Sequence, residues 1–235
     1  MVAPHHRVAA TLGFVLAVVL TPREALWAFG VHAGVLALVG AVAQVNPRRV
    51  LRRTLVETPF VVFALLLPVL GPDPTTRVAG MNLSVEGLWG AWAILVKATL
   101  SVVAVSLLSA TTSTPEVLRG LARLRVPVLL CTVATLMVRY LEVIADELRR
   151  QRVARLARGD DPRWWFQARA MVAGVGATFV RSYERGERVH QAMLSRGFTG
   201  ALPVTEQDRV GRWSPAIAAL APAVAGSAAL IAVLG

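Results

Sequence analysis

The chain has 235 residues, of which 55% are hydrophobic and 17% charged, with a mean hydropathy of +0.58 and a formal charge of +11. A soluble domain of this length carries more charge, so the composition predicts a protein that crosses the membrane several times. A basic chain can also bind nucleic acid, but the enrichment of basic residues in cytoplasmic loops explains the charge more simply. The single cysteine, Cys131, excludes a disulfide within the chain, and its apolar surroundings predict a small buried side chain.

Five apolar segments are long enough, or nearly so, to cross the hydrocarbon core, which takes about twenty helical residues. The first, 8–20, is short and follows an N-terminus that resembles a signal peptide without a cleavage site, so we expect an uncleaved span. The third, 55–70, is also short. The second, fourth and fifth have full length and cover 25–45, 88–110 and 215–234. Pro222 is expected to kink the last helix without ending it.

Basic residues between the spans predict the orientation. The loop 46–53 carries four arginines, whereas the loops after the first and third spans carry one each. The segment 111–212 holds 17 arginines and 10 acidic residues. The positive-inside rule therefore places the N-terminus and both arginine-rich segments in the cytoplasm, and the C-terminus outside. The predicted organisation is a four-span unit over 1–110, a cytoplasmic segment over 111–212 and a closing span over 213–235.

The cytoplasmic segment is predicted to open with a helix. Thr114, Pro115 and Glu116 supply a capping residue, a proline in the first turn and an early acidic residue. Pro127 is expected to end or kink that helix, and an amphipathic helix follows. The apolar first half of this second helix, 126–145, is predicted to lie against the membrane or a partner. The alternative is a sixth span, which would place the following arginines outside, against the charge rule.

A further helical stretch is predicted from Trp164 to Arg196. Its apolar centre, 170–180, indicates burial against another helix, because it is too short to cross the membrane. Gly186 is expected to mark a bend that splits the stretch in two. The adjacent residues Trp164 and Trp165 are predicted to lie at the cytoplasmic membrane surface.

Two helices of the cytoplasmic segment are predicted to end on nearly the same residues, “ARLARG” at 154–159 and “AMLSRG” at 192–197. Glycine is common just after a helix C-terminus, and a cation there is favourable by about 0.3–1 kcal/mol. Capping accounts for the glycine and the arginine but not for the repetition. A slim helix end with an arginine at its tip can enter a groove and pair with carboxylates. Two such ends therefore predict two similar grooves, such as those of a dimer of related proteins.

Several segments together resemble a known transporter family. They are “LTPREALWA”, “RRVLRRTLVETPFVVFALLLPVLG”, “EGLWGAWAILVKATL”, “ATTSTPEVLRGLARLRVP”, “VRYLEVIADELRRQRVARLARG”, “DDPRWWFQARA” and “FVRSYERGERVHQAMLSRGFTGALP”. They cover nearly the whole chain and resemble the transmembrane T component of energy-coupling-factor (ECF) transporters, most closely the CbiQ type associated with cobalt uptake. The two arginine motifs mark the T-component class, and “SYERGERVHQAML” and “EGLWGAW” indicate the CbiQ branch.

The resemblance implies an all-α integral membrane protein of the bacterial inner membrane, with about five transmembrane helices and a cytoplasmic insert of coupling helices before the last span. Such a subunit does not hydrolyse ATP, and its coupling helices dock into grooves on two ABC ATPase subunits, which bind ATP and Mg²⁺. The docking residues that the resemblance implies are Ala157, Arg158, Gly159, Ser195, Arg196 and Gly197. Serine departs from the alanine that the family has at the start of this motif, but it is also small.

The resemblance also implies partners within the membrane. A small S component, here CbiM-like, binds the substrate and is supported by the coupling helices, and a CbiN-like accessory subunit is a further expected partner. ATP-driven motion of the ATPases passes through the helices to the S component. Cobalt is the expected substrate, and nickel, biotin or another vitamin is the alternative, because the T component does not carry the specificity.

Catalytic motifs are absent from the sequence. It contains no GxxxxGK[ST] phosphate loop, so ATP is expected to be handled by a partner. It also contains no GxSxG or HExxH motif. We therefore expect a non-catalytic chain that binds no cofactor. The alternative from a different class, a membrane scaffold or membrane-embedded enzyme unrelated to ATPases, lacks a candidate nucleophile or metal cluster.

Four further polar residues are candidates for special roles. Lys97 lies near the centre of the fourth span, where an ionisable group is costly, and Glu57 near the start of the third span is its candidate partner. A structural salt bridge is favoured over a transport role for this intramembrane pair. His5 and His6 are expected in a solvated N-terminal tail, and no metal ligand is assigned, because two adjacent histidines alone make a poor site.

Overall fold

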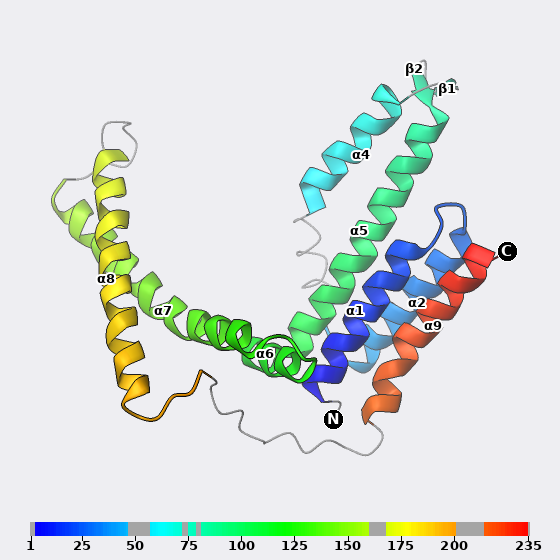
Figure 1. Ribbon diagram of the computed structural model, residues 1–235. Helices are drawn as coiled ribbons and strands as arrows, with labels where there is room; N and C mark the ends of the chain where they lie inside the picture. Colours follow the sequence, from blue (N-terminus) through cyan, green and yellow to red (C-terminus); the bar gives the residue numbers. More distant parts are fainter. Residues whose placement is uncertain are drawn as a thin grey trace. The chain divides into compact units, whose positions relative to one another are not determined.

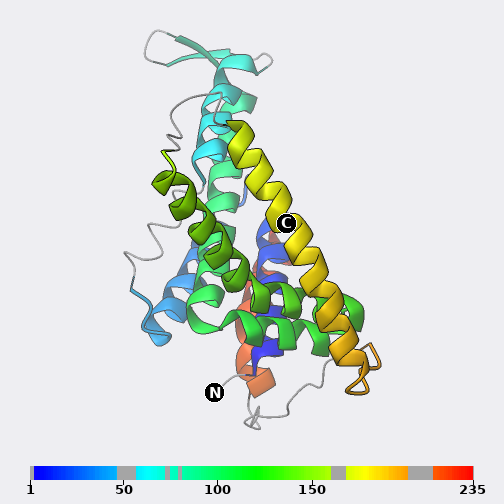
Figure 2. The ribbon, with the colours of Figure 1, turned by 90° about the vertical axis from the view of Figure 1, so that its left-hand side faces the viewer.

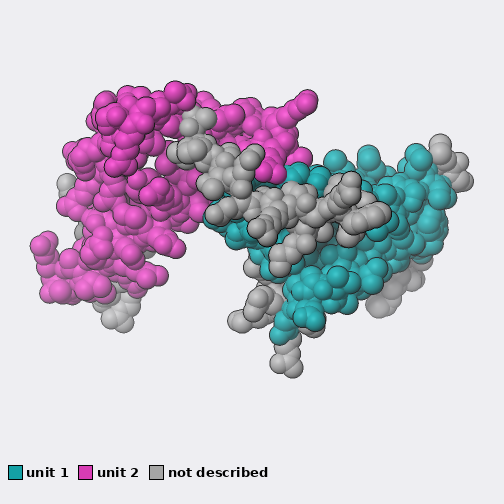
Figure 3. All heavy atoms as spheres, turned by 90° about the horizontal axis from the view of Figure 1, so that it is seen from below, with its two compact units in different colours: residues 1–120, 207–235 teal, residues 121–206 magenta. Residues whose placement is uncertain are grey.

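The computed structural model describes residues 3–46, 57–71, 75–78, 81–159, 168–200 and 214–234. These residues are almost all helical (Figure 1). The chain divides into two compact units, one formed by Met1–Gly120 with Gln207–Gly235 and the other by Leu121–Glu206 (Figure 3).

The helices of the first unit are α1 (Pro4–Leu20), α2 (Leu26–Val42), α4 (Thr58–Leu70), α5 (Val85–Thr111) and α9 (Ser214–Leu234). Each corresponds to one predicted span, and α9 continues through Pro222 as predicted. Among the described residues of this unit, α5 is long and apolar enough to cross a membrane, and the others are shorter apolar helices. The 17 residues of α1 and of α2 measure about 25 Å at 1.5 Å per residue, a few ångströms less than a typical hydrocarbon core.

Four helices of this unit, α1, α2, α5 and α9, pack around a common apolar core. The core residues are Phe14, Ala17, Val18, Phe29, Leu36, Leu100, Ala104, Leu107, Ala225 and Ala229. His32 of α2 is fully buried beside this core, and its Nε2 lies 3.2 Å from the carbonyl oxygen of Ala225 in α9. The last helix of the chain therefore packs with the first two, although about a hundred residues of sequence separate it from α5.

The α4 helix packs against α5, and a β-hairpin lies between them in the chain (Figures 1 and 2). Its strands, β1 (Thr75–Val78) and β2 (Met81–Ser84), pair antiparallel with Thr75 opposite Ser84. We expected only a loop here, because four-residue strands leave no clear alternation in the sequence. Ser84 ends the hairpin and caps α5, since its Oγ accepts a hydrogen bond of 3.1 Å from the amide of Gly87.

The α6 helix (Thr114–Arg123) begins one residue away from its predicted cap. Ser113, rather than Thr114, precedes the helix, and Glu116 Oε2 accepts hydrogen bonds of 2.7 Å from both the amide and the hydroxyl of Ser113. The bond from the Ser113 amide is one half of a capping box, and the two hydrogen bonds lower the pKa of the Glu116 carboxyl. The helix ends at Arg123, before Pro127.

The second unit consists mainly of two long helices, α7 (Val128–Ala157) and α8 (Ala168–Leu194). The bounds of α7 agree with the prediction of a helix that follows Pro127 and ends near Gly159. By length and composition α7 is also apolar enough to cross a membrane, so the alternative of a sixth span over 126–145 remains open.

The predicted division of α8 at Gly186 is wrong, because the helix runs through this glycine without interruption. A glycine in a helix interior costs about 1 kcal/mol relative to alanine, which a helix of 27 residues can tolerate. The neighbouring sequence also favours the helix. Arg188 pairs with Glu184 at 3.9 Å, one turn earlier, and this ion pair spans the glycine.

Candidate functional site

The α7 helix ends in a left-handed glycine. Its C-cap is Arg158, whose amide donates to the carbonyl of Arg155 at 2.9 Å. The next residue, Gly159, has φ +81° and donates to Leu156 at 3.1 Å. A Cβ at Gly159 would meet nothing within 4 Å. The backbone angle, rather than crowding, therefore favours glycine here.

The α8 helix ends with the same backbone conformation. The amide of Arg196 donates to Met193 at 3.0 Å, and Gly197, again at φ +81°, donates to Leu194 at 2.9 Å. The amide of Phe198 also donates to Met193 at 3.0 Å, which completes a Schellman motif. The two repeated sequences thus form the same local structure, with the arginine at or next to the C-cap.

Both endings are exposed over all six predicted docking residues. Within the part of the chain that the structure describes, neither the Arg158 nor the Arg196 guanidinium has a hydrogen-bond or ion-pair partner. Ser195 turns its hydroxyl back to its own helix, where it donates to the carbonyl of Ala192 at 3.1 Å. The hydroxyl of Ser195 is therefore hydrogen-bonded within its own helix, so Ser195 can take the place of an alanine as a small residue.

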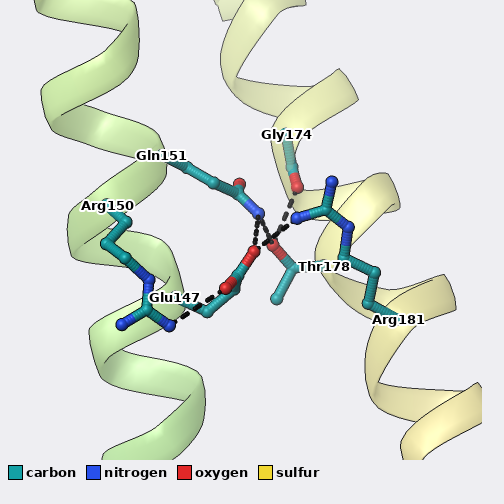
Figure 4. Close-up of polar contacts among 6 residues, drawn as sticks. All are labelled: Glu147, Arg150, Gln151, Gly174, Thr178 and Arg181. Carbon is teal, nitrogen blue, oxygen red and sulfur yellow. Dashed lines mark hydrogen bonds and ion pairs between the residues drawn. The ribbon is translucent and has the colours of Figure 1, made fainter.

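A polar cluster connects α7 to α8 (Figure 4). Glu147 of α7 accepts hydrogen bonds from Arg150 at 3.1 Å, from Gln151 at 3.3 Å and from Arg181 of α8 at 2.5 Å. Gln151 also donates to the hydroxyl of Thr178 at 2.9 Å. The side chain of Glu147 is 17% exposed, and the hydrogen bonds from Arg150, Gln151 and Arg181 lower its pKa to about 2. The carboxylate is therefore ionised at neutral pH.

The order of these contacts shows that α7 and α8 run in opposite directions where they meet. Glu147 contacts Arg181, and Gln151, one turn later in α7, contacts Thr178, nearly one turn earlier in α8. A Cβ on Gly174 would lie 3.2 Å from Nη1 of Arg155, a further turn along each helix. We call these six residues, Glu147, Gln151, Arg155, Gly174, Thr178 and Arg181, the α7–α8 junction.

The junction places the two arginines on opposite sides of the helix crossing. Arg158 follows Gln151 by seven residues, whereas Arg196 follows Thr178 by eighteen. At 1.5 Å per residue these lengths are about 10 Å and about 27 Å. Because the helices run in opposite directions, the two ends extend away from each other, and a single small groove cannot hold both.

The apolar centre of α8 is not buried in the way that the sequence predicted. Its large side chains are exposed in the isolated chain, with Val172 at 70% and Phe179 at 71%. Small and polar residues, Gly174 and Thr178, face α7 instead. Among the residues of this unit whose burial is described, only Cys131, Thr132 and Thr178 are buried. Cys131 is free and buried, as predicted.

Lys97 and Glu57 each bind a different group from the one that the sequence suggested. Nζ of Lys97 donates to the backbone carbonyl of Val19 at 2.8 Å, and Oε2 of Glu57 accepts from the hydroxyl of Thr99 at 2.9 Å. Glu57 is buried, and its other oxygen, Oε1, has no partner among the described residues. A long flexible lysine can reach a backbone carbonyl of α1, which sequence spacing does not reveal.

Other predicted features are only partly described. His5 and His6 lie in the first turn of α1 rather than in a solvated tail, because Pro4 begins the helix. Across the described ranges there is no group of three or more His, Cys, Asp or Glu side chains that could hold a metal. Trp164, Trp165 and most of the arginine-rich loop 46–53 lie outside the described residues.

The junction residues were not predicted from the sequence as a site. The available signal was weak. Glu147 and Gln151 are spaced by one turn, and Gly174, Thr178 and Arg181 follow at spacings of four and three, so each set shares a helix face. Nothing in either spacing says that the two faces meet.

Comparison with known proteins identifies the family. The family model for the cobalt transport protein CbiQ matches residues 2–207 of this chain. The cobalt transport protein CbiQ of Rhodobacter capsulatus is 29% identical over 143 residues, which are 60% of this chain and 55% of the relative. The match thus spans little more than half of the length of that relative. Because the family model covers most of the chain, this helical membrane protein belongs to the CbiQ family of cobalt transport proteins.

Proposed function

We propose that this chain is the transmembrane coupling subunit, the T component, of an ECF-type importer. In this role it catalyses no reaction and binds no cofactor. It receives the ATP-driven motion of two ABC ATPase subunits through the ends of α7 and α8 and passes it to a substrate-binding S component in the membrane. The family is that of cobalt transport proteins, and the coupling role and the partners are what we add to it.

The observation that carries this proposal is the pair of similar helix endings. Each ends in a left-handed glycine, and each presents an exposed arginine without a partner among the described residues. An unpaired guanidinium on a slim helix end is suited to a groove that contains carboxylates. Because the two ends extend in opposite directions from the junction, they suit two separate sockets better than one.

The charge distribution supports a particular placement in the membrane. The positive-inside rule favours a cytoplasmic N-terminus and cytoplasmic helix endings, where ATP is available to the partner ATPases. The membrane that we propose for this multi-pass chain is the bacterial inner membrane. Cobalt is the proposed substrate because both the matching family and the relative are cobalt transport proteins. The substrate itself would bind to a CbiM-like S component, with a CbiN-like accessory subunit beside it.

The decisive experiment reverses the charge of the two arginines. The variants Arg158→Glu, Arg196→Glu and the double variant are co-expressed with the ATPases and the S component. Removal of one partner from a buried charge pair costs about 2–5 kcal/mol, so each single variant should lose roughly thirtyfold or more in ATPase affinity through its own ending. The measurements are ATPase co-purification and uptake of radioactive cobalt, with nickel as the comparison.

The matched control is Arg149→Glu, which makes the same charge change in α7 on a side chain that is 83% exposed and whose ion-pair partner among the described residues is Asp146 of its own helix, at 4.0 Å. This variant should retain both ATPases and uptake. Normal cobalt uptake and ATPase binding in the double variant would refute the docking role. Transport of nickel but not cobalt by the intact complex would refute the proposed substrate and leave the coupling role standing.

A further inference from the structure

We propose that the α7–α8 junction is a positioning device that holds the two arginine endings in one fixed relation, with Glu147 and Arg181 as its principal residues. This inference rests on the proposed function, because the spacing of the two endings matters only if two ATPases dock on them at the same time. It concerns residues that touch neither ATPase, and it assigns a role to a cluster that the docking motifs do not include.

The first reason is that polar contacts, rather than an apolar core, determine how α7 and α8 meet. The large apolar side chains of α8 near the junction, such as Val172, Val175 and Phe179, are exposed, and Thr178 is the buried residue of α8 at the contact. The hydrophobic effect is not directional, and helices whose large apolar side chains are exposed have few interlocking side chains to fix their angle. Hydrogen bonds between charged groups have narrow geometry, so they define a single arrangement.

The second reason is that Glu147 joins donors from both helices. Arg150 and Gln151 approach it from its own helix, and Arg181 approaches it from α8 (Figure 4). Gln151 in turn donates to Thr178, whose hydroxyl donates to the carbonyl of Gly174 at 2.9 Å. One carboxylate and one amide thus connect each helix to the other at two successive turns. Two contacts at different heights resist rotation, whereas a single contact would act as a pivot.

The third reason is the close approach at Gly174. A Cβ there would lie 3.2 Å from Nη1 of Arg155 and 3.4 Å from Oε1 of Gln151, which is tighter than ordinary contact for the first of them. The absence of a side chain at Gly174 therefore leaves room for the ends of two long polar side chains of α7 beside the backbone of α8. A Cβ there would require the end of the Arg155 side chain to shift by a few tenths of an ångström.

The angle at which α7 and α8 cross strongly affects the position of Arg196, because Arg196 lies far from the junction. Over about 27 Å, a rotation of 10° about the crossing moves the end of α8 by about 5 Å. A displacement of this size is larger than the length of a hydrogen bond. The end of α7, at about 10 Å, would move by less than 2 Å for the same rotation. Loss of the junction should therefore disturb the docking of Arg196 more than that of Arg158.

The test measures the relation between the two endings in the full chain alone, in lipid nanodiscs and without ATPases. Spin labels are placed at the exposed positions Val153→Cys and Gln191→Cys in a Cys131→Ala background, and pulsed electron paramagnetic resonance gives the distance distribution between them. Gln191 lies 13 residues, or about 20 Å, beyond Thr178, so a rotation of 10° moves this label by about 3 Å. We therefore expect one narrow distribution for the parent and a distribution broadened or shifted by about 3 Å for Glu147→Ala and for Arg181→Ala.

Two further sets of variants separate positioning from a general loss of structure. Glu184→Ala and Arg188→Ala remove an ion pair of the same type within α8, at 3.9 Å, and should leave the distribution narrow. The charge swap that combines Glu147→Arg with Arg181→Glu keeps an attractive pair across the helices but deprives Arg150 and Gln151 of their acceptor, so it should narrow the distribution only in part. A distribution that is unchanged in both alanine variants would overturn the proposal.

The docking consequence is measured separately, by native mass spectrometry of the chain with its ATPases. Glu147→Ala and Arg181→Ala should shift the complexes from two bound ATPases towards one, and the swap should recover part of the doubly bound population. If charge reversal of Arg158 and Arg196 leaves ATPase binding intact, the proposed coupling function fails, although the distance measurement can still support the junction as a positioning device. If charge reversal abolishes binding but the junction variants do not change the distances, the function stands and the positioning role fails.

Discussion

The left-handed glycine at each helix ending offers a sharp test, because the same substitution should have opposite effects at two positions of α8. Gly197 has φ +81° and nothing within 4 Å of its Cβ position, and Gly186 lies in the helix interior, also with open space around it. Alanine at Gly197 is therefore opposed only by the backbone angle. Alanine at Gly186 removes a residue that disfavours the helix and adds no clash.

The magnitudes follow from these backbone terms. A left-handed conformation costs an ordinary L-residue about 1–2 kcal/mol, so Gly197→Ala should reduce the population of the closed cap, relative to its frayed form, by roughly five- to thirtyfold. Gly186→Ala should stabilise the helix by about 1 kcal/mol. If docking requires the closed cap, ATPase affinity through the Arg196 ending falls in proportion to the fraction of closed cap that remains. Gly159→Ala should do the same at the other ending.

Hydrogen exchange at the amide of Phe198 is the direct assay, because this amide is protected only while it donates to the carbonyl of Met193. Exchange should be faster in Gly197→Ala and unchanged or slower in Gly186→Ala. Titration of the ATPase onto the chain should follow the same order. Equal exchange rates in the two variants would refute the account of the ending as a glycine-dependent cap, and a loss of affinity in Gly186→Ala alone would show that helix continuity matters instead.

Two further predictions concern the junction and the topology. The pKa of Glu147 is lowered to about 2 from an ordinary value near 4.5, so its carboxylate stabilises the junction at neutral pH, and this contribution is lost as the pH falls from about 4.5 towards 2. The distance distribution should therefore stay narrow down to about pH 5 and broaden progressively below it. The distribution of Glu147→Ala should already be broad at neutral pH. For the topology, a cysteine introduced at Gly200 should be shielded from a membrane-impermeant thiol reagent in intact cells and react after permeabilisation; ready labelling in intact cells would contradict the cytoplasmic placement of the helix endings.

The parts of the fold that could be predicted are those that local chemistry decides. A proline before α7 and glycines after α7 and α8 have strong backbone preferences of their own, so the bounds of these helices could be derived from Pro127, Gly159 and Gly197. Apolar runs likewise located the helices of the first unit. The misjudged cap at Ser113 shows the limit of such signals. Serine and threonine are both good caps, and the position of Glu116 three residues after Ser113 is the spacing that favours Ser113.

The interpretation of Gly186 failed for a related reason. A glycine weakens a helix by about 1 kcal/mol, but whether the helix breaks depends on what its neighbours contribute. The flanking segment is rich in glutamate and arginine, which are good helix formers, and the Glu184–Arg188 pair bridges the position. A single unfavourable residue therefore did not predict a boundary, whereas Gly159 and Gly197, each followed within six residues by a proline, did.

Contacts between helices were the part that the sequence did not reveal, and the junction shows why. The apolar run 170–180 predicted that the face of α8 rich in Val and Phe would be buried, but the residues that meet α7 are Gly174 and Thr178. The hydrophobic pattern shows which side chains avoid water. In a membrane protein, lipid or another subunit can cover these side chains as well as a neighbouring helix can. Small and polar residues allow two helices to approach closely and to form directional hydrogen bonds. Their spacing in the sequence does not show which helix they contact.

The direction of the helices at the junction changes what the repeated motif implies. Two identical endings in the sequence are compatible with helices that lie parallel and present both arginines to one surface. The contacts of Glu147 with Arg181 and of Gln151 with Thr178 require the opposite, with the two endings on either side of the crossing. In the proposed function, two separate subunits bind one ending each, and the junction sets the distance between the endings at which both bind. The two proposed roles are therefore complementary, since the repeated arginine supplies the contact and the unrepeated junction sets its spacing.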